Sequence, residues 1–303
     1  MFDFYFPNII NQNSSSWCLS LIATLIGTLV GAGLGFWGAI RLQKKQEKNF
    51  AYQKLSLFSA LTNDVLTLMR KQIDEYVELT VNITKEPYEY HLPQKLASFD
   101  LERIHYLLKG EIFSPLVFVL GSVANDYYKN FRKTIDYIYL ANNELYNMNQ
   151  KHIDFTYGDQ CFVRDSVDDI MNIIVKRFEF IRTTNAEFEK DIEYLYLLEL
   201  DSKLRRLRKE SEEKKNSNLE GYKTDFLEEL LKNGLSIIEQ ENSFEIIVKA
   251  KPALNRLEKI KNNSLQFIVD CKSYCDLINE QLPHLESYNE TLKENLKIIN
   301  KKN

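Results

Sequence analysis

The sequence predicts an all-α fold in which a single N-terminal transmembrane helix continues into a cytoplasmic bundle of long antiparallel helices. Three observations support this. Residues 17–40 hold no charged side chain, apolar residues then recur at spacings of three and four, and the 303-residue chain contains only 10 Gly and 6 Pro. We therefore expect four parts: a short extracytoplasmic tail (1–16), a transmembrane helix (17–40), a helical cytoplasmic domain (41–218) and a C-terminal helical, coiled-coil-like region (219–303).

The uncharged stretch is long enough to cross a bilayer. Its 24 residues would form a helix of about 36 Å, against a hydrocarbon core of about 30 Å. Trp17 and Trp37 lie near its ends, where indole rings favour the headgroup layer. The preceding residues lack the Lys or Arg of a cleaved signal peptide.

Charged flanks predict the orientation of this helix. Asp3 is the one charged residue before it, whereas four basic residues follow it closely: Arg41, Lys44, Lys45 and Lys48. We call these four the basic collar. Because Lys and Arg remain on the cytoplasmic side, we expect the N-terminus outside, the large body in the cytoplasm, and the protein in the inner (plasma) membrane. The collar could also hold anionic lipid headgroups.

Small residues line one face of the predicted span. They recur every fourth position: Ala23, Gly27, Gly31, Gly35 and Ala39. Residues four apart share a helix face, and small faces let two membrane helices approach closely. The sequence therefore predicts that the protein self-associates into a homo-oligomer through this small-residue face.

Helices fill the predicted body. We expect one over 41–82, a loop over 83–94, a short helix over 99–109, and a longer helix from Ser114 to about Met148. A loop over 151–165 then precedes a helix to about 210, which ends in the polar stretch 204–218. Further helices are expected over 221–240 and, despite β-branched residues, over 243–249. A heptad seam from Ile268 to Ile299 follows, with Asn289 as its polar member and Pro283 starting a new helix.

Motifs for chemistry are missing from the sequence. It contains no GxxxxGK[ST], no GxGxxG after a strand and no GxSxG, so no cofactor is expected. Its four histidines are scattered, and Cys271 and Cys275 fit two small apolar seam positions better than a zinc site. The net charge of −4 gives no reason to expect nucleic acid. Basic residues over 203–209 precede acids that can pair with them, which indicates a solvated helix end.

These observations favour a membrane-anchored, non-enzymatic helical protein that acts as an interaction or scaffold module. Its expected partners are the lipid bilayer, copies of itself and a cytoplasmic protein. One alternative is a membrane-perturbing effector of a bacterial anti-phage defence system. Another is an enzyme with a site assembled from distant residues, for which His105, His152 and the segment 151–165 would be the first suspects.

Overall fold

The computed structural model describes residues 14–89, 98–214 and 218–301. Within these ranges the chain is helical apart from short connections, and it forms no strand. The elements in chain order are α1 (Ser14–Lys85), α2 (Ser98–Leu108), α3 (Phe113–Leu120), η1 (Gly121–Val123), α4 (Ala124–Thr184), η2 (Phe188–Lys190), α5 (Ile192–Lys214), α6 (Leu219–Gly221), the π-helical η3 (Tyr222–Glu228), α7 (Glu229–Lys232), η4 (Gly234–Ser236) and α8 (Gln240–Lys301).

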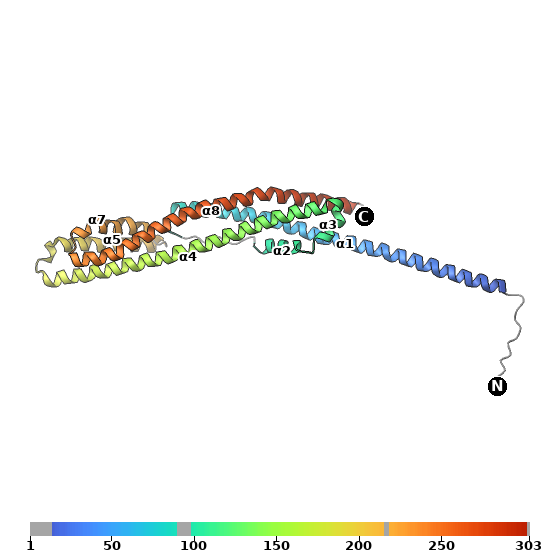
Figure 1. The fold of residues 1–303 in the computed structure, drawn as a ribbon. Helices are drawn as coiled ribbons and strands as arrows, with labels where there is room; N and C mark the ends of the chain where they lie inside the picture. The colour runs from blue at the N-terminus through green and yellow to red at the C-terminus, as the bar shows by residue number, and fades with distance from the viewer. Residues whose placement is uncertain (1–13, 90–97, 215–217, 302–303) are drawn as a thin grey trace, which may run out of the picture.

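The molecule is elongated, and three long helices dominate it (Figure 1). The C-terminal half of α1 and all of α4 run in the same direction, and α8 runs antiparallel to both. The N-terminal half of α1 projects from the body as a lone rod. At about 1.5 Å per residue, the 72 residues of α1 extend over about 108 Å.

Two hydrophobic cores hold the body together. The proximal core, nearer the rod, joins α1, α2, α3, the first part of α4 and the second part of α8. Phe58 and Phe131 meet there, with ring centroids 5.0 Å apart. The distal core joins the later part of α4 to α5, η3, α7 and the first part of α8, around the fully buried Phe226 and Leu197. Because α4 and α8 contribute to both cores, they tie the two ends of the body into one unit.

The main features of the all-α prediction are confirmed. The apolar row of α1 is buried from Leu55 to Tyr76, and residues 243–249 belong to α8. The heptad seam is buried from Ile268 to Leu296, including Asn289. These positions bury apolar side chains at helical spacing, which stabilises packed helices.

The predicted loop over 151–165 is wrong, because this segment is an uninterrupted part of α4. Its helical period is carried mainly by polar residues: Asn149, His152, Thr156, Asp159 and Gln160 are buried at spacings of three and four. Polar side chains contribute nothing to a hydrophobic pattern, so a search for apolar periodicity fails over this stretch.

The predicted break at Pro283 is also wrong, because α8 runs continuously through both Pro252 and Pro283. Both prolines are on its exposed side. A proline removes one backbone donor, and on a solvent-facing side water can satisfy the carbonyl that is left over. The flanking Leu282 and Leu285 remain buried against α1 and α4.

Two further boundaries differ from the prediction. The helix expected over 114–148 is interrupted at Gly121, whose φ of 61° favours glycine, and it restarts as the much longer α4. The helix expected to reach 210 ends at Thr184 and restarts as α5 at Ile192. This turn shifts the buried face, so Leu195 and Leu198 are exposed while Tyr196, Leu197 and Leu200 are buried.

Parts of three predicted segments lie outside the described residues. Of the predicted loop 83–94, α1 continues to Lys85, a turn follows, and residues 90–94 are not described. Residues 1–13 of the predicted tail and residues 215–217 of the polar stretch are likewise not described. The polar stretch begins as a helix, since α5 extends to Lys214.

Candidate membrane-anchoring site

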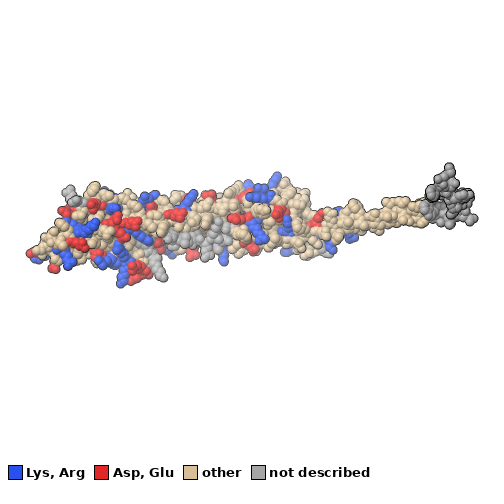
Figure 2. Space-filling model, turned by 90° about the horizontal axis from the view of Figure 1, so that it is seen from below, with Lys and Arg blue, Asp and Glu red and all other residues tan. Residues whose placement is uncertain are grey.

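The projecting half of α1 is long and apolar enough to span a membrane. Its most apolar 18-residue window has a mean hydropathy of 1.7, and none of that window is buried in the protein. No residue from Ser20 to Phe50 is buried, and burial begins at Ala51. Figure 2 shows this rod without acidic or basic side chains until it nears the body, over which charges are spread. A helix that is apolar all round needs an apolar environment, which the described protein does not supply.

The predicted small-residue face is open along the rod. Its five residues, Ala23, Gly27, Gly31, Gly35 and Ala39, are all exposed. A Cβ atom added at Gly27, Gly31 or Gly35 would meet no described atom within 4 Å. The body therefore leaves this face uncovered, and self-association through it stays a prediction.

The hydroxyl groups beside this face bond within the helix. Thr24 Oγ1 donates to the Ser20 carbonyl at 2.7 Å, and Thr28 Oγ1 donates to the Thr24 carbonyl. Such back-bonding to the preceding turn occupies the hydroxyl protons. These two hydroxyl groups are therefore satisfied within α1 itself.

The basic collar lies where the rod meets the body. The Arg41 guanidinium stacks over the Trp37 ring, 5.4 Å from its centroid. Arg41, Lys44, Lys45 and Lys48 border a hollow of about 740 Å³ together with Glu47, Asn49 and Phe118 of α3. The collar thus adjoins one end of the body as well as the predicted membrane surface.

The rod is firmly joined to the body because both are parts of one helix. Leu55 and Phe58, one to two turns beyond the exposed rod, are fully buried in the proximal core. Ser59 Oγ donates a buried hydrogen bond of 2.7 Å to Asn289 Oδ1 on α8. Lys54 forms an ion pair of 3.1 Å with Glu111. A rotation or tilt of the rod therefore acts directly on the packed helices of the body.

The two suspect histidines of an assembled active site lie apart. His105 of α2 has its Nδ1 atom 3.1 Å from the Asp136 carboxylate of α4, and its ring stacks on Tyr139. His152 is buried and stacks on Phe267, with centroids 4.5 Å apart. Asp136 and His152 are 16 positions apart on α4, or about 24 Å along the helix axis. The structure does not bring these histidines together.

Polar residues in the middle of α4 separate the two cores. Asp159 pairs with Arg256 of α8 at 2.7 Å, and Gln160 donates to the Tyr88 carbonyl after α1. From α8, Ser264 donates to the Pro87 carbonyl at 2.7 Å. These bonds give buried polar atoms partners and fix where the end of α1 lies against α4 and α8. A helical spacing of polar residues was the sequence signal for this layer.

The remaining sequence candidates serve packing. Cys271 and Cys275 are free and buried in the proximal core. The hydrogen bond with Cys275 and burial raise the pKa of the Cys271 thiol. Among the described residues, no group of three or more His, Cys, Asp or Glu side chains is placed to hold a metal ion.

The basic residues over 203–209 form ion pairs within α5, as predicted, and also with other helices. Within α5, Arg206 pairs with Glu210 at 3.6 Å and Lys209 with Glu213 at 3.8 Å. Lys203 binds Glu229 at 2.7 Å, and Arg206 binds Asp225 at 3.0 Å. Arg208 pairs with Asp168 of α4. Several partners lie on other helices, so this cluster also helps to join α5 to its neighbours.

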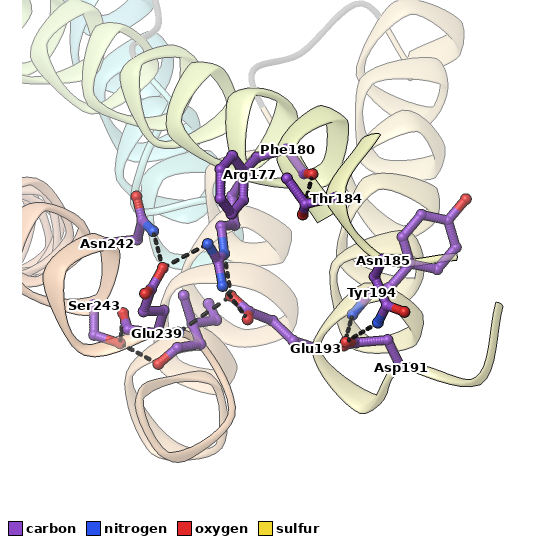
Figure 3. A network of polar contacts seen from close by, with 11 residues as sticks. Arg177, Phe180, Thr184, Asn185, Asp191, Glu193, Tyr194, Glu239, Asn242 and Ser243 are labelled. Carbon is purple, nitrogen blue, oxygen red and sulfur yellow. Dashed lines mark hydrogen bonds and ion pairs between the residues drawn. The ribbon is translucent and has the colours of Figure 1, made fainter. Parts of the chain in front are cut away.

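A network of ion pairs around an arginine at the distal end of the body was not predicted from the sequence. Arg177 of α4 donates two hydrogen bonds of 2.9 Å to Glu193 of α5 and forms an ion pair of 2.5 Å with Glu239, just before α8 (Figure 3). Only 14% of the Arg177 side chain is exposed. The Glu193 hydrogen bonds raise the pKa of Arg177. Its two partners, Glu193 and Glu239, lie 16 and 62 positions further along the chain, so no local sequence pattern could reveal them.

Comparisons with known proteins identify no relative. No protein-family model, no curated protein and no solved structure matches the chain. The arguments for its function therefore come from its own residues.

Proposed function

We propose that the protein is a membrane-anchored, non-enzymatic scaffold whose helical body faces the cytoplasm. The observation that carries this proposal is the projecting half of α1, which is apolar all round and exposed. In water such a rod is costly, at about 25 cal/mol for each Å² of apolar surface. In a bilayer the same rod is favoured, and its helical backbone satisfies its own hydrogen bonds.

The collar supports the orientation. Its basic side chains lie at the body end of the rod, and basic residues flanking a membrane helix remain on the cytoplasmic side. In this arrangement the elongated body stands on the cytoplasmic face of the inner membrane. Its long exposed surface is then available to a cytoplasmic protein partner.

We further propose that copies of the protein associate through Ala23, Gly27, Gly31, Gly35 and Ala39. Support comes from the open, small-residue face of the rod. Two such faces can approach closely and gain van der Waals contact along their length. Because α1 is one continuous helix, association of the rods would bring their bodies together.

The test is chemical crosslinking of full-length protein in native membranes. Replacing Gly27, Gly31 and Gly35 together with Leu is expected to abolish crosslinked oligomers, because the bulky side chains keep the helices apart. The matched control is Gly33→Leu, which lies about 200° around the helix from Gly31 and should leave the oligomers intact. Unchanged oligomers in the triple variant would refute self-association through this face.

A further inference from the structure

The end of the body beside the collar is apolar and exposed. It is formed by α3 and η1, and the chain carries no charge between Glu111 and Asp126. Four of its apolar side chains face outward: Phe113, Val117, Phe118 and Val123. We call these four the apolar tip. The helices that carry the tip are bent by 72° relative to α2.

The rest of this segment is fixed within the body. Ile112 and Leu116 are buried in the proximal core, so α3 is anchored along one side. Gly121, with its φ of 61°, then turns the chain into η1 and α4. The buried neighbours therefore hold the apolar tip in place on the surface of the body. In this position 47% of Phe118 and 60% of Val123 are exposed.

The anchor helix places this tip close to the bilayer. Phe118 borders the same hollow as Arg41 and Asn49. Arg41 directly follows the predicted transmembrane helix, and Asn49 lies eight positions further along α1, or about 12 Å along its axis. Headgroup layers add about 5–8 Å to each side of the hydrocarbon core. The span is also longer than the core, and a tilt of α1 toward α3 would accommodate the excess.

We propose that the apolar tip inserts into the headgroup layer of the bilayer that α1 spans, as a second and shallow membrane contact. This inference rests on the proposed membrane anchoring. Charge selects lipid as the occupant, because Phe118 of the tip borders the same hollow as the four basic residues of the collar, which attract anionic headgroups. Apolar groups flanked by Lys and Arg are the pattern of interfacial membrane segments. Two contacts would fix the tilt of the body on the membrane, which a single helix leaves free.

The experiment measures how spin labels on the full-length protein contact lipid and water. The protein is placed in nanodiscs that contain phosphatidylglycerol, with the Cys18→Ser and Cys161→Ser changes removing two native thiols. A nitroxide is attached singly through Phe118→Cys, Val123→Cys, Leu29→Cys in the rod, or Tyr157→Cys on the distal body. Collisions with oxygen, which concentrates in lipid, are compared with collisions with a water-soluble nickel chelate.

We expect the labels at 118 and 123 to show an oxygen-to-nickel ratio several-fold above that at 157 and below that at 29. If the label at 29 reports lipid while those at 118 and 123 match 157, the inference fails and the anchoring stands. If the label at 29 reports water, both fail. A label at 118 that neither reagent reaches, with spin–spin broadening that disappears on dilution with unlabelled protein, would show that a second copy covers the tip and would overturn the lipid contact.

Discussion

The two halves of α1 are one helix with the same backbone, yet they differ completely in what surrounds their side chains. From Ser20 to Phe50 no side chain is buried. From Ala51 to Lys85 a buried apolar stripe faces α3, α4 and α8, and polar residues face outward. Helical structure alone therefore does not indicate what surrounds the side chains of a segment. The distribution of apolar residues around the helix does, because an apolar stripe needs protein on one side and an all-round apolar surface needs an apolar environment on every side.

The two halves should differ most in how the truncation of a large side chain changes the free energy of unfolding. Phe58 is fully buried and packs on Phe131, so we expect Phe58→Ala to lower the free energy of unfolding of the body by about 3–5 kcal/mol. Leu29→Ala, in the exposed rod, should leave it unchanged. Urea unfolding of the full-length protein in detergent micelles, followed by circular dichroism, measures both. Equal losses would show that the rod packs against the body.

Removing an arginine should likewise lower the free energy of unfolding in the body and not in the exposed part of α1. Arg177→Met leaves the largely buried Glu193 without its cation, while the Glu239 backbone N–H still donates to it, and we expect a loss of about 3 kcal/mol. Arg41→Met removes a collar charge that lies over the Trp37 ring of the same exposed rod and should not change unfolding. The same urea titrations provide the values, and an unaffected Arg177→Met variant would contradict the role given to this network.

Hydroxyl groups give a smaller contrast. Ser59→Ala leaves the buried Asn289 Oδ1 without its donor, which should cost about 1–3 kcal/mol. Adding Asn289→Leu replaces both partners by apolar groups and should restore most of the stability. Thr24→Ala in the rod, whose hydroxyl bonds only to its own helix, is the control. A double variant as unstable as Ser59→Ala would refute the assigned hydrogen bond.

Glycines give the smallest contrast. Gly158 lies on the exposed side of α4, and an added Cβ would meet no described atom within 4 Å. Gly158→Ala should therefore raise the free energy of unfolding by about 0.5–1 kcal/mol. Gly234→Ala would place its Cβ 2.9 Å from the Tyr196 hydroxyl and should be destabilising. Thermal melts of both variants test the pair, and a Gly158→Ala variant that melts lower would contradict its placement in the helix.

Much of the fold was predictable because apolar periodicity extends over long stretches. The buried row from Leu55 to Tyr76 and the seam from Ile268 to Leu296 both follow it. The prediction of a loop around His152 was wrong because the buried positions of this helical segment are polar. The prediction of a helix break at Pro283 was wrong because this proline is exposed, so water can satisfy the backbone carbonyl that it leaves without a donor.

The candidate site divides in the same way. The span, the small-residue face and the collar were visible in the sequence because each is a local pattern. The position of Phe118 at the hollow that the collar borders was not visible, since this hollow lies between α3 and α1, which are far apart in the sequence. The Arg177 network, which unites α4, α5 and the start of α8, is hidden for the same reason.

A cysteine scan of the rod tests whether copies of the protein meet through the small-residue face within the membrane. Single cysteines from position 22 to position 36, in a Cys18→Ser background, are oxidised in native membranes and dimers are counted. We expect the yield of dimers to follow a helical period, with maxima at positions 27, 31 and 35 and minima at 25, 29 and 33. Maxima on the opposite face, or no disulfide-linked dimer at any position, would contradict it.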